Sequence, residues 1–244
     1  MNTLRDLLDA EIPLVAVSFG DDDSERLAHE AKAAGVDVAE LRIDRYSRTD
    51  TDHVLQQVRT FKSLPILATL RSTHEGGEWS GTEEERLDLF RAVAPEVQAV
   101  DIELSSRGIL ADVISAAHEN DTLAIVSYHN FAFTPGTEEL ETVIAEAKNA
   151  GADVVKVSTM VTSDSDVKRL ASLLLKAGAD TRLIVIAMGP IGAVSRVFFP
   201  ALGSPITYSF IGSSSAPGQL DFSETFRLLR TFYPDFDQRK TVES

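Results

Sequence analysis

Eight short runs rich in β-branched residues constrain the fold of this chain more than any other feature of its sequence. Consecutive runs begin roughly 25 to 30 residues apart, which leaves room for one helix between each pair. The runs are LVAVSF from Leu14, VAELRI from Val38, PILATLR from Pro65, AVDIEL from Ala99, TLAIVSYH from Thr122, DVVKVST from Asp153, RLIVIAM from Arg182 and ITYSFI from Ile206. Such alternation is typical of β-α units around a parallel sheet.

The stretches between the runs carry the start and stop signals of helices. Expected starts are Asp22, Thr82, Thr137 and Asp164, expected ends include Gly35, Gly151 and Gly178, and the segment from Asp221 to Tyr233 supplies an eighth helix. No Pro/Gly/Ser-rich linker divides the chain. We therefore expect residues 1–244 to form a single α/β domain, a (β/α)8 TIM barrel. An open Rossmann-like sheet is the alternative, although no run is followed by G-x-G-x-x-G.

The amino-acid composition limits the kinds of molecule that this chain can bind. The net charge of −15 repels the phosphates of nucleic acids and the anionic surface of a membrane, so we expect neither as a partner. The chain has no cysteine, which excludes thiolate metal sites and cysteine nucleophiles. Acidic residues interrupt MNTLRDLLDAEIP, where a secretory signal would be apolar. We expect a cytoplasmic protein that acts on a small molecule.

Charged residues share one face of several expected strands. In a barrel, alternate strand residues point inward, and active sites lie at the C-terminal ends of the strands. The residues of matching parity are Glu40, Arg42 and Asp44 on the second strand, Thr69 and Arg71 on the third, Asp101 and Glu103 on the fourth, Ser127 and His129 on the fifth, and Lys156 and Ser158 on the sixth. Buried charges are costly unless paired, so this many at one end indicate a catalytic mouth.

Two of these residues suggest specific chemistry. Lys156 is the only lysine inside an expected strand. Among arginines in a partly dry mouth, its pKa should be lowered, which would leave a neutral amine able to attack a ketone. The structural alternative is a buried counter-ion to Glu40 or Asp101. His129 suits a group that takes a proton and returns it, unless it is a core histidine bonded to a backbone carbonyl.

Two glycine-containing loops follow the last strands. The segment MGPIGAVSR, residues 188–196, is not a P-loop, and its Arg196 suits a carboxylate ligand as well as a phosphate. The segment GSSSAPGQ, residues 212–219, is small and polar, as a closing lid would be.

Together these segments resemble the type I 3-dehydroquinate dehydratase family over nearly the whole chain. The resemblance rests on E-L-R-I-D (residues 40–44), T-L-R-S-x-x-E-G-G-E (69–78), S-Y-H-N-F (127–131), the strand lysine Lys156, M-G-x-x-G-x-x-S-R (188–196) and S-A-P-G-Q (215–219). It implies elimination of water from 3-dehydroquinate to give 3-dehydroshikimate in the shikimate pathway. It also implies that no metal or cofactor takes part, and that the protein forms a homodimer, as members often do.

The same resemblance implies roles for individual residues. Lys156 would form the Schiff base, His129 would transfer protons and Glu75 would be its acidic partner. Arg196 would bind the substrate carboxylate with Ser215 and Gln219 closing over it, and the site would be lined by Ser18, Glu40, Arg42 and Arg71.

The chain also departs from the family pattern. Asn130 stands where members often carry Asp, and the N-terminal segment looks short for the hairpin that covers the barrel floor. Two other functions stay open. A class I aldolase also uses a barrel-strand lysine and an imine, although it usually needs a phosphate site, and a silent barrel would be a binding scaffold. Turnover of 3-dehydroquinate discriminates among the three.

Overall fold

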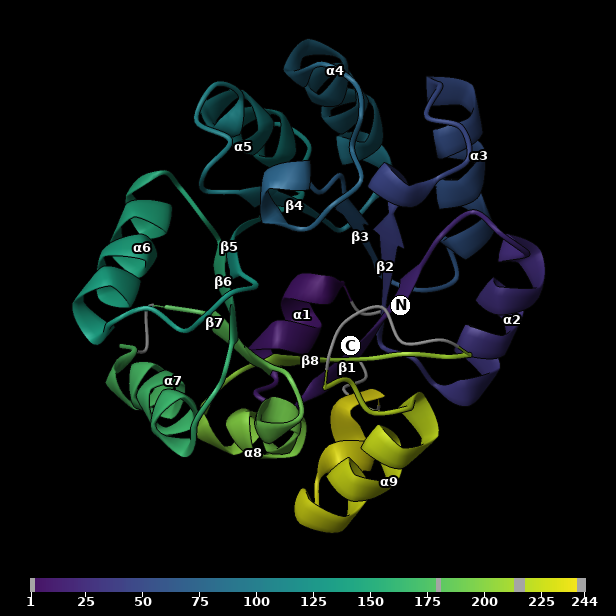
Figure 1. Ribbon diagram of the computed structural model, residues 1–244. Coiled ribbons are helices and arrows are strands. Elements are labelled where there is room, and N and C mark those ends of the chain that lie inside the picture. Colours follow the sequence, from purple (N-terminus) through teal and green to yellow (C-terminus); the bar gives the residue numbers. More distant parts are fainter. Residues whose placement is uncertain (1–2, 179–180, 213–217, 241–244) are drawn as a thin grey trace.

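A ring of eight strands surrounded by helices forms the protein, as Figure 1 shows. The computed structural model describes residues 3–178, 181–212 and 218–240. The strands are β1 (Leu14–Phe19), β2 (Val38–Arg42), β3 (Ile66–Thr69), β4 (Ala99–Glu103), β5 (Leu123–Asn130), β6 (Val154–Met160), β7 (Leu183–Met188) and β8 (Ile206–Ser209). Each expected run overlaps one of these strands, so the prediction of eight strands is confirmed.

The strands form a nearly closed parallel barrel. They pair in the order β7-β6-β5-β4-β3-β2-β1-β8, which follows the sequence around the ring. β1 pairs with both the second and the last strand of the sequence: Ala16 lies opposite Val38 of β2 on one side and Tyr208 of β8 on the other. An open doubly wound sheet reverses its strand order at a switch point, and this order shows no reversal. The Rossmann-like alternative is therefore wrong.

Helices cover the outside of the barrel. They are α2 (Ser24–Ala34), α3 (Thr51–Phe61), α4 (Glu83–Val93), α5 (Leu110–His118), α6 (Thr137–Asn149), α7 (Asp164–Lys176), α8 (Ser195–Phe198) and α9 (Phe222–Phe232). Thr82 caps α4 as expected. Its side chain accepts a hydrogen bond from the Glu85 backbone N–H, and the Glu85 carboxylate accepts one from the Thr82 backbone N–H, which completes a capping box. The starts expected at Asp22, Thr137 and Asp164 are each displaced by one residue, because the capping positions are 23, 136 and 163.

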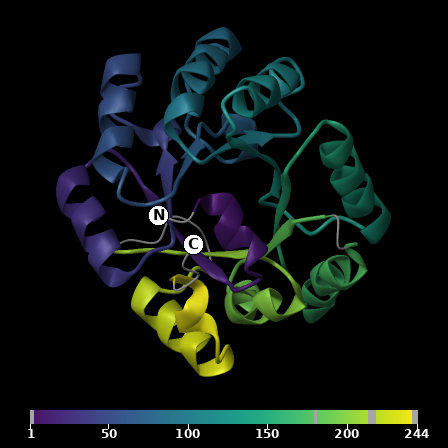
Figure 2. The ribbon, with the colours of Figure 1, turned by 180° about the vertical axis from the view of Figure 1, so that it is seen from behind.

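A short N-terminal helix, α1 (Leu4–Asp9), closes the floor of the barrel. Leu4, Leu7 and Leu8 are buried and pack with the lumen residues at the N-terminal ends of the strands, such as Leu14 and Ile206. Figure 2 shows α1 lying across the centre of the ring. This apolar plug covers the floor of the barrel among the described residues, at the end opposite to the C-terminal ends of the strands.

Candidate active site

A cavity opens at the C-terminal ends of the strands and encloses about 610 Å³, counted out to its open mouth. Its lining consists of Ser18, Glu40, Arg42, Arg45, Arg71, Glu75, Gly76, His129, Phe131, Lys156, Ser158, Ile186, Met188, Arg196, Tyr208 and Gln219. Every expected site residue that the structure describes is among them. Ser215 lies outside the described residues.

Lys156, in the middle of β6, is held between two carboxylates. Its side-chain nitrogen lies 3.0 Å from Asp101 Oδ2 and 3.7 Å from Glu40 Oε1. Only 4% of the residue is exposed. The same nitrogen lies 4.5 Å from the centroid of the Tyr208 ring, which gives the ammonium a cation–π contact. The alternative of a buried counter-ion to Glu40 or Asp101 therefore describes the geometry of the ligand-free site.

The expectation of a lowered pKa for Lys156 is wrong in this state. Burial does lower the pKa, but the attraction of Asp101, with further contributions from Tyr208 and Glu40, outweighs burial and raises the pKa of Lys156 above its usual value. The parity argument counted the neighbouring arginines as the dominant charges. Arg71 is itself neutralised by acids, so its effect on the lysine is smaller than that of Asp101. The amine is therefore protonated before substrate arrives.

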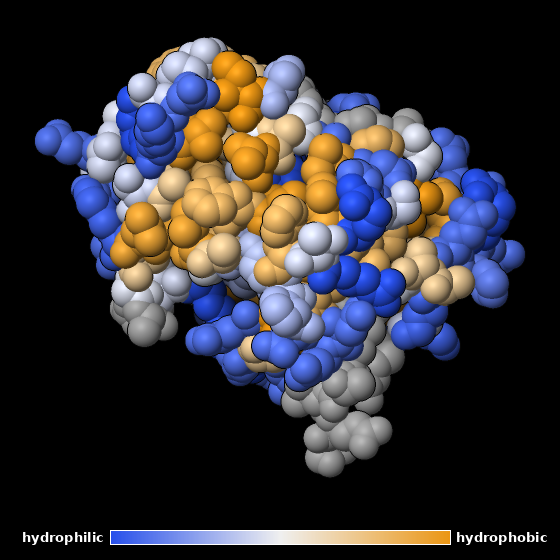
Figure 3. All heavy atoms as spheres, turned by 90° about the horizontal axis from the view of Figure 1, so that it is seen from below, coloured by the Kyte–Doolittle hydropathy of each residue, from blue (hydrophilic) through white to orange (hydrophobic). Residues whose placement is uncertain are grey.

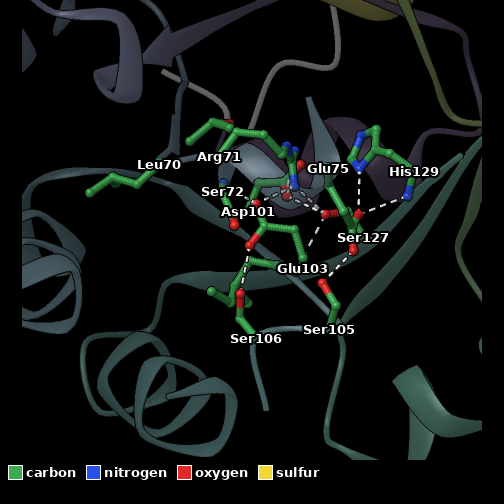
Figure 4. A network of polar contacts seen from close by, with 12 residues as sticks. Leu70, Arg71, Ser72, Glu75, Asp101, Glu103, Ser105, Ser106, Ser127 and His129 are labelled. Atoms are coloured by element: carbon green, nitrogen blue, oxygen red, sulfur yellow. Dashed lines mark hydrogen bonds and ion pairs between the residues drawn. The ribbon is translucent and has the colours of Figure 1, made fainter. Parts of the chain in front are cut away.

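Arg71, which follows β3, ties the third, fourth and fifth strands together. Its Nη2 lies 2.8 Å from Asp101 Oδ1, and its Nη1 lies 3.1 Å from Glu103 Oε1 and 2.6 Å from Ser127 Oγ. Figure 4 shows these contacts converging around the guanidinium. Arg86 of α4 approaches Glu103 from the other side and also donates to the Leu70 carbonyl at 2.7 Å. Buried charges are thus paired on both sides, which is the condition for their stability.

Glu75 and His129 form a second pair on the cavity wall. Glu75 Oε2 accepts a hydrogen bond from the His129 backbone N–H at 2.8 Å and lies 3.0 Å from His129 Nδ1 (Figure 4). The turn that brings Glu75 across needs Gly77, because a Cβ there would lie 2.0 Å from the Arg71 carbonyl oxygen. With Nδ1 facing the carboxyl group, Nε2 is the ring nitrogen left for proton transfer.

Burial moves the pKa values of this pair in opposite directions. The pKa of His129 lies well below its usual value because the ring is buried and because Arg71 and Lys156 oppose a further positive charge nearby. The pKa of Glu75 is raised to about 7, mainly by burial. A neutral imidazole next to a carboxyl group that titrates near neutrality is well suited to take up a proton and return it.

The remaining polar wall is built around Glu40 and Arg42 of β2. Ser18 donates to Glu40 Oε2, and Thr69 Oγ1 donates to Glu40 Oε1 at 3.1 Å. Arg42 forms a two-point contact with Asp44, with Nε to Oδ1 at 2.9 Å and Nη2 to Oδ2 at 2.7 Å. These contacts fix Glu40 as an acceptor and Arg42 as a donor at the mouth of the cavity.

Arg196, on α8, differs from the other arginines of the site. It is 2% exposed, yet its Nε and Nη2 have no hydrogen-bond partner within the described part of the chain. Burial lowers its pKa to about 10, and an arginine with such a pKa still carries its charge at neutral pH. A buried guanidinium with two unoccupied donors on one edge is a preformed site for a carboxylate. Gln219 reaches the same cavity from the loop that follows β8.

Several residues of the site were not assigned a role from the sequence, and three of them, Asp101, Tyr208 and Ser158, carry buried polar groups. Asp101 shares the inward parity of Glu103 and was considered only as an alternative counter-ion. Tyr208 and Ser158 line the cavity with hydroxyl groups that have no hydrogen-bond partner among the described residues. Ser158 lies two residues after Lys156, so its parity was visible in the sequence. Tyr208 was missed because an inward tyrosine on an apolar strand looks like a core residue.

Comparison with known proteins decides the family. The profile of a family described as "Type I 3-dehydroquinase" matches residues 12–235. The chain belongs to the type I 3-dehydroquinase family. A 3-dehydroquinate dehydratase from Methanosarcina barkeri is 36% identical over 232 residues, which are 91% of this chain and 96% of that protein.

Solved structures of 3-dehydroquinate dehydratases agree with the assignment. The 3-dehydroquinate dehydratase from Aquifex aeolicus VF5 superposes with a TM-score of 0.82 at 34% identity, covering 90% of this chain and 99% of that chain. The enzyme from Geobacillus kaustophilus HTA426 gives a TM-score of 0.86 at 30% identity, with 91% of each chain covered. The predicted TIM barrel is confirmed.

Asn130 is one point at which this member of the family departs from the expected pattern, and the structure shows its effect. Asn130 Oδ1 accepts hydrogen bonds from the backbone N–H groups of Ala132 and Phe133, at 3.0 Å each. The side chain therefore shapes the turn after β5. His129 is held by Glu75 and not by its neighbour in the sequence.

Proposed function

We propose that this chain removes water from 3-dehydroquinate to form 3-dehydroshikimate, through an imine on Lys156. The observation that carries the proposal is the presence, in one cavity, of a buried lysine, a histidine–carboxyl pair and Arg196, whose Nε and Nη2 have no hydrogen-bond partner among the described residues. The relatives named 3-dehydroquinate dehydratase support the choice of substrate. Residues 1–244 would form the catalytic domain, and 3-dehydroquinate would be the small-molecule partner.

The first step is condensation of Lys156 with the C3 ketone. The amine attacks the carbonyl carbon, and loss of water leaves an iminium that draws electrons from C2 far more strongly than the ketone does. Because Asp101 raises the pKa of Lys156, the ammonium must first lose a proton. Transfer to the neutral His129 in the same cavity is uphill, because the pKa of His129 lies below that of Lys156, and consumption of the free amine by the ketone draws it forward. His129 would therefore assist formation of the imine as well as the later proton transfers.

The elimination itself would belong to His129 and Glu75. His129 removes the C2 proton, the electron pair forms the C1–C2 double bond, and the C1 hydroxyl leaves as water with a proton returned by the imidazolium. Glu75 orients the ring through Nδ1 and stabilises its positive charge. Water then hydrolyses the imine and frees the amine of Lys156. These steps balance without a metal or an organic cofactor.

Binding contacts would hold the ring of the substrate between the two ends of the cavity. Arg196 would bind the carboxylate, with Ser215 and Gln219 closing over it. Ser18, Glu40, Arg42 and Arg71 would contact the hydroxyl groups, directly or by fixing the groups that do. Among the described residues, no cluster of three or more His, Cys, Asp or Glu side chains is arranged to hold a metal ion.

A direct assay tests the activity. The product is a conjugated enone, so its absorbance in the ultraviolet should rise when the protein is mixed with 3-dehydroquinate. An aldolase would instead cleave a phosphorylated sugar, and a scaffold would turn over neither compound. Cleavage of a sugar phosphate without any dehydration of 3-dehydroquinate would contradict the proposal. Nε and Nη2 of Arg196, which have no hydrogen-bond partner in the described part of the chain, favour a planar carboxylate as the ligand.

Two further parts of the proposal concern location and assembly. We place the enzyme in the cytoplasm, with the other steps of its pathway, and expect a homodimer. None of the helices in the described ranges is long and apolar enough to cross a membrane. Val194, Phe198 of α8 and Phe232 of α9 are exposed, and many hydrophobic residues lie on the face shown in Figure 3, which supports the expectation of an interface. Light scattering after size-exclusion chromatography tests the dimer.

A further inference from the structure

The cavity contains hydrogen-bonding atoms that nothing in the ligand-free protein satisfies. Besides Nε and Nη2 of Arg196, the hydroxyl oxygens of Tyr208 and Ser158 are buried without a hydrogen-bond partner in the described parts of the chain. An unsatisfied buried polar atom is costly, so a group of them around one cavity marks where a ligand supplies the missing partners. Tyr208 is the most informative of these residues because of what surrounds it.

Tyr208 lines the same cavity as Lys156 and Arg196. It is on β8, opposite Ala16 of β1, and 4% of the residue is exposed. Lys156 sits over the face of its ring, and its phenol is close enough to Arg196 to influence the pKa of the guanidinium. The ammonium thus lies over the ring and can only donate, so the phenol hydrogen has no acceptor within the described ranges.

The neighbours of Tyr208 decide what its hydroxyl can do. Burial raises the pKa of Tyr208 above its usual value, so the phenol stays protonated and is a donor at neutral pH. Lysine and arginine have donors but no acceptors. The nearby carboxylates of Glu40 and Asp101 already accept from Ser18 and Thr69 and from Lys156 and Ser127, respectively. Tyr208 donates to neither carboxylate and to no other described residue, which leaves a bound ligand as the candidate acceptor for its proton.

We propose that Tyr208 is a further substrate-binding residue, whose hydroxyl donates a hydrogen bond to the carboxylate that Arg196 binds. This inference rests on the proposed function. A carboxylate has about four lone-pair positions, so it accepts the two-donor edge of Arg196 and still has room for a neutral phenol. The phenol adds a donor without adding a third positive charge next to Lys156. It would thereby strengthen binding without raising the charge around the amine.

Tyr208→Phe is the decisive variant, because it removes one oxygen and keeps the ring beneath Lys156. The KM for 3-dehydroquinate should rise about 10- to 100-fold, the usual effect of losing a hydrogen bond to a charged group, while kcat changes little. Without ligand, the variant should be at least as stable to urea as the wild type, because the oxygen it lacks was unsatisfied. A merely structural tyrosine would lower stability and leave KM unchanged.

Tyr46→Phe is the matched control. Its hydroxyl is also buried and without a hydrogen-bond partner among the described residues, but Tyr46 does not line the active-site cavity. Like Tyr208→Phe, the Tyr46→Phe control should be at least as stable to urea as the wild type. Its KM for 3-dehydroquinate should be unchanged. A rise in KM equal to that of Tyr208→Phe would overturn the inference, because removal of any buried hydroxyl would then produce the effect.

The combination of Tyr208→Phe with Arg196→Lys tests whether both residues hold the same group. Two donors to one carboxylate should be coupled, so the double variant should lose less binding than the product of the single effects. If the two substitutions affected KM independently, or if Tyr208→Phe lowered kcat and left KM unchanged, the phenol would act at Lys156 and the inference would be overturned. Wild-type turnover is measured first. Its absence would refute the proposed function, whereas an unchanged KM in an active Tyr208→Phe enzyme would refute only this inference.

Discussion

Replacing Asp101 with asparagine removes the charge on which the centre of the site depends. Asp101 is fully buried and lies 3.0 Å from Lys156 Nζ and 2.8 Å from Arg71 Nη2. At an effective dielectric constant of about 20, each of these contacts is worth about 6 kcal/mol of attraction before desolvation is counted. The neutral amide would keep the shape of the side chain but leave two buried cations under-compensated. We expect a loss of about 3–5 kcal/mol in the free energy of unfolding.

Urea denaturation followed by circular dichroism measures this loss. Glu141→Gln is the control, because Lys176 and Glu141 are 2.8 Å apart but exposed, and such a pair contributes less than about 1 kcal/mol. The contacts of Asp101 hold its pKa well below the usual range despite burial. Its contribution is therefore complete above the unfolded pKa of about 4 and declines as the pH falls below that value. A stability within about 1 kcal/mol of wild type at pH 7 would refute the reasoning.

Three other predictions follow from the geometry of the cavity. Arg196→Lys keeps the charge but loses the two-donor edge, so KM should rise about tenfold or more with the fold intact, as steady-state kinetics would show; unchanged constants would exclude Arg196 from carboxylate binding. The raised pKa of Glu75 means that folding is favoured when the carboxyl group is protonated. The contribution of this group to the free energy of unfolding is full below about pH 4 and is lost as the pH rises through about 7. The free energy of unfolding of Glu75→Gln should therefore rise by about 3 kcal/mol relative to wild type between about pH 4 and 8. Parallel pH profiles of stability for the two proteins would contradict this. Activity should survive exhaustive chelation, and a loss restored by a divalent ion would overturn the metal-free mechanism.

The barrel was predictable because strand-forming runs and helix signals repeat around the ring without a break. Leu14–Phe19 was predicted to the residue, since both of its faces are buried and the run is continuous. Asp22 was predicted as a cap one residue too early. Asp23, with a φ of 55°, occupies that position without a cap hydrogen bond, and no propensity rule signals this conformation.

The site was predictable in its membership but not in its electrostatics. Inward parity brought Arg71, His129 and Lys156 to one mouth, and the structure places them around one cavity. The sign of the pKa shift of Lys156 depended on which inward charges were already paired. Arg71 is neutralised by Asp101 and Glu103, which requires distances between strands that sequence parity does not supply.

Reductive trapping tests the central claim, the imine on Lys156, most directly. With 3-dehydroquinate and borohydride, the wild-type enzyme should lose activity and gain a covalent adduct that mass spectrometry maps to Lys156, because reduction turns a reversible imine into a stable amine. Lys156→Ala should show neither adduct nor turnover. His129→Ala should still form adduct, in lower yield if the histidine also deprotonates the lysine, while turnover falls about 100-fold or more. Near-normal turnover by Lys156→Ala, or an adduct on another residue, would contradict the account.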